Sequence, residues 1–138
     1  MKIFKPALII LLVFIIPQLY YSCIKDYSYE GGAPSIGSVI LKGSTNGCVD
    51  TVYGTYKAGT ILDSSNYILD SVTVTREGNY TIVTDTLNGI GFKATGRFKN
   101  TGQYAVKLIG YGTPRTTGTY NYALTYDSSN CVVSITFN

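Results

Sequence analysis

The side chains that could do chemistry in this sequence are carboxylates and thiols, because it contains no histidine. That absence excludes a Ser-His-Asp or Cys-His site and most zinc sites. The carboxylates stand singly among expected turns and strand ends, at Asp26, Glu30, Asp50, Asp63, Asp70, Glu77, Asp85 and Asp127. A glycosidase needs two carboxylates that face each other, and this spacing does not indicate such a pair. We therefore expect no enzyme activity, no catalytic residues and no cofactor, with a small hydrolase as a distant alternative.

Loop oxygens at residues 127–130, Asp-Ser-Ser-Asn, have the composition of a calcium site as well as that of a turn. These residue types are common in turns because their short polar side chains bond to the nearby backbone. We expect the turn and no bound metal.

The N-terminal segment has the order of charges and apolar residues of a signal peptide. Lys2 and Lys5 precede an uncharged apolar run over residues 7–16, which Pro17 ends. This run is shorter than the roughly 20 apolar residues that a membrane-spanning helix needs. We therefore expect the segment to be cleaved, with a retained membrane helix as the alternative.

Residues 19–23, Leu-Tyr-Tyr-Ser-Cys, resemble the lipobox of bacterial lipoproteins, in which a small residue precedes a cysteine that is acylated and becomes the new N-terminus. Ser22 and Cys23 match the last two positions, whereas Tyr20 and Tyr21 are bulkier than usual. The match is similar to the relaxed form of Bacteroidota-type bacteria. It implies a signal peptide over residues 1–22, lipidation of Cys23 and anchoring in the outer membrane, facing either the surface or the periplasm. The alternative is an ordinary signal peptide with an incidental cysteine.

The residues after Cys23 predict a flexible tether over 23–37, because they lack periodicity and end in Gly-Gly-Ala-Pro at 31–34. Their charges, at Lys25, Asp26 and Glu30, could instead belong to a sorting signal. The formal charge of the whole chain is +3, and two of the positive charges lie in the expected signal peptide. The near-neutral remainder does not indicate a nucleic-acid partner.

Of the three cysteines, Cys48 and Cys131 remain once Cys23 is assigned to lipidation. An oxidising envelope compartment favours a disulfide between them. Cys131 is in phase with Val133 and Ile135, so its side chain is expected to face the core. Two buried free thiols are the alternative.

Period-2 alternation recurs from Ser38 to the end of the chain, without a window of helical spacing. The expected strands cover residues 38–41, 50–56, 67–75, 80–84, 90–98, 104–108, 120–126 and 131–137. Turn residues separate them, and Glu77-Gly78 and Asn88-Gly89 suit short hairpin loops. We expect an all-β, antiparallel β-sandwich of about seven to eight strands over residues 38–138.

A short unit opens three of these strands: Gly78-Asn79-Tyr80, Gly102-Gln103-Tyr104 and Gly118-Thr119-Tyr120. A glycine turn followed by an inward tyrosine places the ring in the core, with its hydroxyl at the rim for a backbone partner. The alternative is a row of exposed tyrosines that stack on sugar rings.

Most of the expected domain resembles immunoglobulin-like modules of Bacteroidota-type surface and secreted proteins. The segments that carry the resemblance are Gly54-Thr55-Tyr56, Gly78-Asn79-Tyr80-Thr81-Ile82, Gly89-Ile90-Gly91-Phe92, Thr95-Gly96-Arg97-Phe98, and Gly112-Thr113-Pro114 followed by Gly118-Thr119-Tyr120. The resemblance implies an immunoglobulin-like sandwich in an exported protein. We expect this domain to act by binding a glycan or protein ligand. Tyr53, Tyr67 and Tyr111 fall outside the main inward pattern and are the expected ligand-facing residues. The alternative is a structural or accessory subunit of an envelope assembly, in which an edge strand pairs with a partner.

Three further positions follow an aspartate in the pattern Asp-Ser/Thr-apolar, which resembles the O-glycosylation acceptor of exported Bacteroidota-type proteins. The acceptors would be Thr51, Ser71 and Thr86. Asp-Thr at the start of a strand is the alternative explanation.

Overall fold

The structure, a computed structural model, describes residues 35–41, 43–44, 47–48 and 50–138. The described residues all belong to one compact unit, Gly32–Asn138. Cys23, the signal peptide and most of the tether lie outside the described residues, so the inferences about them stay predictions. Among the residues that are described, no helix is long and apolar enough to cross a membrane.

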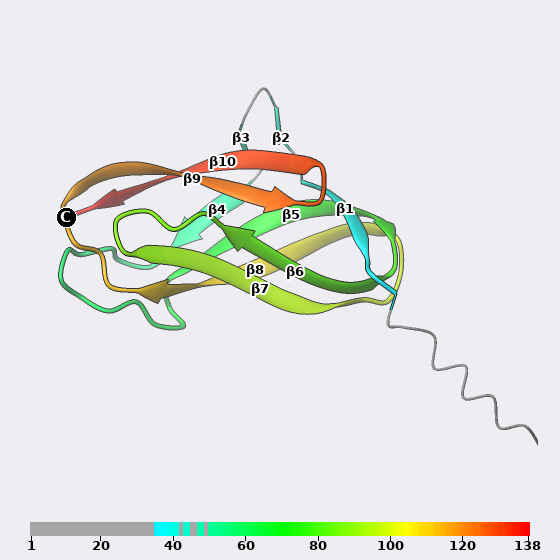
Figure 1. The fold of residues 1–138 in the computed structure, drawn as a ribbon, viewed down its shortest axis with the longest axis horizontal. Helices are drawn as coiled ribbons and strands as arrows, with labels where there is room; N and C mark the ends of the chain where they lie inside the picture. The colour runs from blue at the N-terminus through cyan, green and yellow to red at the C-terminus, as the bar shows by residue number, and fades with distance from the viewer. Residues whose placement is uncertain (1–34, 42, 45–46, 49) are drawn as a thin grey trace, which may run out of the picture. The chain divides into compact units, whose positions relative to one another are not determined.

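The described residues form an all-β fold (Figure 1). The strands are β1 (Ser38–Leu41), β2 (Gly43–Ser44), β3 (Gly47–Cys48), β4 (Asp50–Tyr53), β5 (Tyr67–Arg76), β6 (Gly78–Thr84), β7 (Ile90–Phe98), β8 (Gly102–Gly112), β9 (Gly118–Tyr126) and β10 (Ser129–Phe137). Eight of them have four residues or more, which confirms the predicted fold class and strand number.

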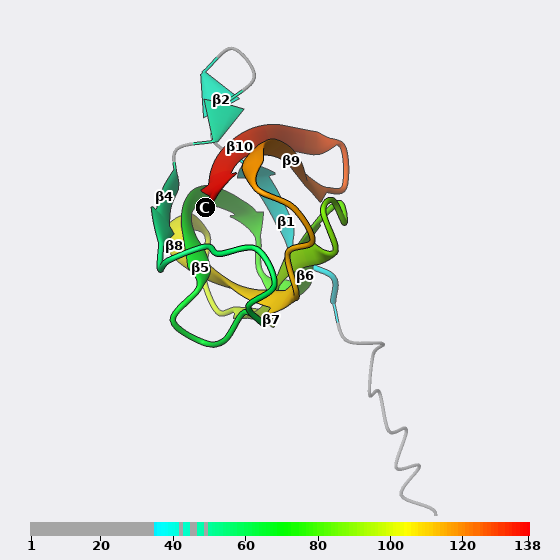
Figure 2. The same ribbon diagram turned by 90° about the vertical axis from the view of Figure 1, so that its left-hand side faces the viewer.

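All the strands belong to one sheet, in the order β1-β5-β8-β7-β6-β9-β10-β3-β2, with β4 also paired to β5. Neighbours are antiparallel except β3 and β10. In Figure 2 the strands from β5 round to β10 surround a common interior. β1 also meets β10, the last long strand in this order, because the Leu41 amide on β1 donates to Ser129 Oγ on β10 at 2.9 Å. The sheet is therefore nearly closed and sandwich-like, and an immunoglobulin-like topology stays a prediction.

The sandwich character comes from two places where pairing is short. β7 pairs with β8 only over Ile90–Lys93, and β6 pairs with β9 only at Val83 and Thr84. Over the rest of their length β7 pairs with β6 and β8 pairs with β5. The β6–β7 pair and the β5–β8 pair therefore diverge. Phe98 packs between the diverging strands, with its ring centroid 4.1 Å from that of Tyr80 and 5.3 Å from that of Tyr104.

The turns at Asn88-Gly89 and Glu77-Gly78 differ, although both have hairpin residues. At the first, Leu87 and Ile90 exchange backbone bonds of 3.1 and 3.0 Å, and Asn88 and Gly89 have φ of 50° and 82°, as a tight hairpin requires. The prediction of a hairpin at Glu77-Gly78 is wrong. β5 pairs with β1, β4 and β8, whereas β6 pairs with β7 and β9, so the chain crosses between layers at Glu77.

The predicted inward faces are confirmed along the long strands. Ile68 and Val72 on β5 are fully buried, as are Leu108 on β8 and Leu124 on β9. On β10 the buried positions alternate with exposed ones from Cys131 to Phe137. Burying one face of each strand contributes about 25 cal/mol per Å² of apolar surface, which makes this shared interior the main source of stability.

Gly78, Gly102 and Gly118 each begin a strand with positive φ, as the repeated unit predicts. The tyrosines that follow them are half-buried and pack against the core, which favours packing over a row of exposed rings. The backbone hydrogen bonds expected of their hydroxyls are made by other tyrosines. Tyr56 donates to Tyr53 O, Tyr122 to Leu87 O and Tyr126 to Gly37 O, at 2.9, 3.1 and 2.7 Å.

Residues 35–37, which we call the lead-in segment, are bonded to the domain although the predicted tether extends to residue 37. The Asn79 amide donates to Ser35 O and the Gly37 amide to Asn79 O, both at 2.8 Å. Arg76 Nε also donates to Ile36 O at 3.0 Å. The folded domain therefore begins before β1.

Gly78 and Gly102 allow a matched test of this attachment. Both have φ above 120°, so an alanine at either position is strained by about 1–3 kcal/mol. A Cβ on Gly102 meets no atom within 4 Å, whereas one on Gly78 lies 2.3 Å from Ser35 O. We expect Gly78→Ala to lower the free energy of unfolding clearly more than Gly102→Ala, as measured by urea denaturation. Equal losses would show that the lead-in segment adds nothing to stability.

Candidate functional site

The three predicted ligand-facing tyrosines lie on one outer face of the sheet. Tyr53 on β4 is directly opposite Tyr67 on β5, and Tyr67 is opposite Ile109 on β8. Tyr111 follows two positions later on β8 and points the same way, because side chains alternate along a strand. We call Tyr53, Tyr67, Ile109 and Tyr111 the tyrosine surface. Tyr53 and Tyr111 are its most open members, at 40% and 46% exposure.

Tyr67 is the fixed centre of this surface. Its ring stacks on that of Tyr53 with the centroids 4.6 Å apart and an interplanar angle of 14°. Lys107 Nζ lies 3.9 Å from the centroid of the same ring, a cation–π contact. Tyr53 and Lys107 come from the strands on either side of β5. Tyr67 therefore has little ring face left for a ligand and instead orients Tyr53.

Tyr111 is held by a different contact. It is paired with Gly91 on β7, and a Cβ at Gly91 would lie 2.5 Å from the Tyr111 hydroxyl oxygen. The tyrosine thus covers the bare backbone of a glycine, a recurrent way of shielding glycines in sheets. The contact with Gly91 fixes the position of the Tyr111 ring, while 46% of the residue remains exposed.

A hollow of about 690 Å³ lies where β6 and β9 separate. Tyr80 and Thr81 line it from β6, and Thr125 and Tyr126 from β9. Arg76 and Asp127 add opposite charges to its lining. The sequence gives no signal of this hollow, because it depends on where pairing stops between strands that are distant in the chain.

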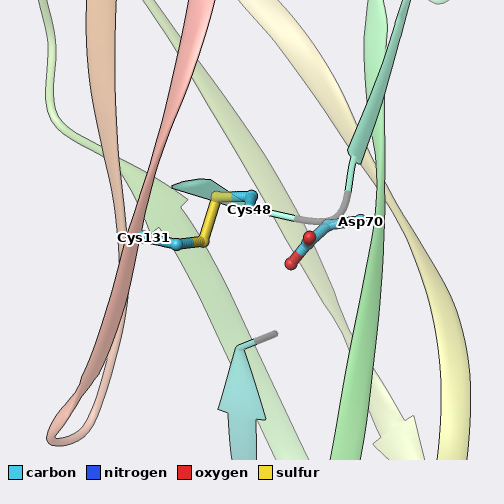
Figure 3. Close-up of side chains that lie close together, drawn as sticks. All are labelled: Cys48, Asp70 and Cys131. Carbon is cyan, nitrogen blue, oxygen red and sulfur yellow. A yellow bond between two sulfur atoms is a disulfide. The ribbon is translucent and has the colours of Figure 1, made fainter. Parts of the chain in front are cut away.

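The predicted disulfide is present between Cys48 and Cys131, with a Cα–Cα distance of 5.0 Å (Figure 3). It joins the short β3 to β10, its neighbour in the strand order. Closing a loop between cysteines 83 residues apart stabilises the domain by about 4–5 kcal/mol on the chain-entropy account.

Asp70 lies beside this disulfide, on the inward face of β5, with its carboxylate directed toward the sulfur atoms (Figure 3). The residue is fully buried, and neither carboxylate oxygen has a hydrogen-bond partner in the described part of the chain. One of these oxygens and the two Sγ atoms all lie within 4.8 Å of one another. We call Cys48, Asp70 and Cys131 the buried cluster.

The electrostatics of Asp70 follow from its surroundings. Burial raises its pKa from 3.8 to about 6, the Asp50 carboxylate adds to the rise, and the nearby Ser71 amide opposes it without a well-formed hydrogen bond. Asp50 is directly opposite Asp70 in the β4–β5 pair, and burial also raises the pKa of Asp50. Like charges opposite each other are unfavourable, so the pair favours a protonated Asp70.

The sequence does contain a signal for Asp70 that our interpretation missed. Asp70 is in phase with Ile68, Val72 and Val74, which are all buried. A carboxylate at an inward position of a central strand is rare enough to mark a special site. The pairing with Asp50 corrects the expectation that the carboxylates stand singly, since it depends on the register between β4 and β5.

The three predicted O-glycosylation acceptors lie in different surroundings. Thr51 on β4 and Thr86 in the turn after β6 are exposed, whereas Ser71 is half-buried in the central strand β5. Two of the preceding aspartates are already engaged, Asp70 in the core and Asp85 through a 2.9 Å bond from the Ala123 amide. Glycosylation of the three positions stays a prediction.

Comparison of the sequence with protein-family models and with curated proteins, and of the structure with solved structures, found no match. The candidate sites therefore have to be judged on their own geometry.

Asp70 predicts an unusual dependence of stability on pH. Because its pKa is higher in the folded chain than the unfolded value of 3.8, the stabilising proton is fully bound below about pH 4 and is lost as pH rises through about 6. The free energy of unfolding should fall over this window by up to about 3 kcal/mol. Urea denaturation from pH 4 to 8 measures it.

The matched variants separate this effect from other titrations. Asp70→Asn keeps the shape and removes the charge, so it should flatten the fall and be more stable than the wild type at pH 8. Asp127→Asn, on the exposed β9–β10 turn, should keep the fall. If the free energy of unfolding of Asp70→Asn fell with pH as much as that of the wild type, Asp70 would not be the group that titrates.

Proposed function

We propose that this chain is a lipid-anchored protein of the bacterial outer envelope that binds a glycan or protein ligand and has no catalytic activity. The tyrosine surface carries the proposal: three strands place Tyr53, Tyr67 and Tyr111 on one outer face, and packing within the sheet fixes all three. Ordered, partly exposed tyrosines are suited to binding because little conformational freedom is lost when a ligand covers them.

The ligand class follows from the chemistry of this surface. Tyr53 and Tyr111 offer ring faces for the apolar face of a sugar or for an aliphatic side chain, and their hydroxyls can bond at the edge. Lys107 adds one positive charge beside them. A neutral or weakly acidic ligand with flat apolar faces fits best, as sugar rings provide. The pairing of carboxylates at Asp50 and Asp70 does not favour hydrolysis, because Asp70 is fully buried and cannot reach a substrate in this conformation.

An assembly subunit is the second candidate, and one observation favours it. β4 pairs with β5 along one edge, and its other edge has no strand partner among the described residues. A partner strand could add there by backbone hydrogen bonds.

Anchoring is tested by fractionating cells that express the wild type or Cys23→Ala. We expect the wild type in the membrane fraction and the variant in the soluble fraction, because the lipid chains supply the attachment. Protease treatment of intact cells then distinguishes a surface location from a periplasmic one. A variant that remains in the membrane would contradict lipidation and indicate a retained helix.

Binding is tested on a polysaccharide array with the purified domain and the double variant Tyr53→Ala/Tyr111→Ala. Removing both open rings should weaken binding by about tenfold or more, given the usual contribution of interfacial tyrosines. Val132→Ala, which removes a 38% exposed side chain on β10, a strand that does not pair with β4, β5 or β8, is the control and should bind like the wild type. Glycan binding that survives the double variant would place the site elsewhere. Co-purification of a fixed partner without glycan binding would favour the assembly subunit.

A further inference from the structure

We propose that reduction of the Cys48–Cys131 disulfide converts the buried cluster into a site for a thiolate-preferring divalent cation such as Zn²⁺, with both sulfur atoms and the Asp70 carboxylate as ligands. The site is closed while the disulfide is intact, because disulfide sulfurs are poor metal ligands and only thiolates bind strongly. This inference is independent of the proposed ligand-binding function.

The distances suit a single ion. Zn²⁺ binds thiolates at about 2.3 Å and carboxylate oxygens at about 2.0–2.2 Å, so tetrahedral ligand atoms lie roughly 3.5–3.8 Å apart. The Asp70 oxygen and the two Sγ atoms are already within 4.8 Å of one another. On reduction the two sulfurs must separate and the carboxylate oxygen must draw closer to them, and rotation of these three side chains provides that movement.

The second observation is the state of Asp70. A fully buried carboxylate without a hydrogen-bond partner in the described residues is costly, and such groups call for an explanation in terms of an ion, a water or a redox role. Its carboxylate is directed toward the disulfide rather than away from it (Figure 3). A cation held between this carboxylate and the sulfurs would satisfy it.

The charge of the reduced cluster favours a divalent cation. Two thiolates and the Asp70 carboxylate carry three negative charges, and Asp50 faces Asp70 from β4. So much negative charge is unfavourable in a buried setting unless protons or a metal neutralise it. The combination of thiolates with a carboxylate is suited to Zn²⁺, whereas Mg²⁺ and Ca²⁺ prefer oxygen ligands alone.

The redox step balances with a dithiol as the reductant. A reductant thiolate attacks Cys48 Sγ, which is half-buried, while Cys131 is the more buried partner and leaves as thiolate. The second reductant thiol then releases Cys48 and forms the reductant's own disulfide. Two electrons and two protons pass to the protein, and binding of the metal releases the two thiol protons to solvent.

Cadmium titration tests the site, since Cd²⁺ bound to thiolates gives an ultraviolet charge-transfer band. The mature chain carries Cys23→Ala, so that Cys48 and Cys131 are its only cysteines. After reduction by a phosphine, we expect one Cd²⁺ per chain, the band, and a rise in melting temperature with added Cd²⁺ or Zn²⁺. The oxidised chain should show none of these.

Matched variants distinguish the proposed ligands. Replacement of outer-shell partners of a metal lowers affinity by about 10- to 100-fold, so loss of a direct ligand in Asp70→Asn should weaken Cd²⁺ binding at least as much. Asp127→Asn should bind like the parent chain. A charge-transfer band without a rise in melting temperature would indicate binding to unfolded chain and overturn the proposal. So would unchanged affinity in Asp70→Asn, or a reduced chain that no metal stabilises.

Discussion

The fold depends on bringing together the two ends of a single long sheet. β1 and β4 both lie along one edge of β5, and β10 is the last long strand at the other end of the order, followed only by the two-residue β3 and β2. The Leu41–Ser129 bond joins β1 to β10, and the Cys48–Cys131 disulfide ties β10 to β3, its neighbour in the order, two positions ahead of β4. Without that closure, the inward residues of β5 and β10 would lose the neighbours that exclude water from them. These two links connect residues 88 and 83 positions apart in the chain.

Much of this fold could be predicted from the sequence because period-2 alternation reports directly which side chains face inward. The strands at Ile90–Phe98 and Tyr67–Arg76 and the inward Cys131 follow from that pattern. Local turn chemistry was less informative, since Glu77-Gly78 has hairpin residues yet connects strands of different layers. The hollow between β6 and β9 and the Asp50–Asp70 pair depend on register between separate strands, which no local pattern contains.

β4 links the two regions that concern function. Its outward residues include Tyr53, the open end of the tyrosine surface, and its inward residues Asp50 and Val52 face the core. Asp50 lies two positions after Cys48, the cysteine that reduction would release. This four-residue strand therefore carries Asp50, opposite Asp70 of the buried cluster, on one face and Tyr53, opposite Tyr67, on the other.

The lead-in segment has a mechanical consequence. Its backbone is bonded to Asn79 on β6, to the Arg76 side chain on β5 and to the Tyr126 hydroxyl on β9. A tension applied to the chain ahead of Ser35 would therefore be divided among three strands instead of peeling one strand from an edge. A domain that is held at the lead-in segment and pulled by a ligand on its outer face would resist unfolding from that end.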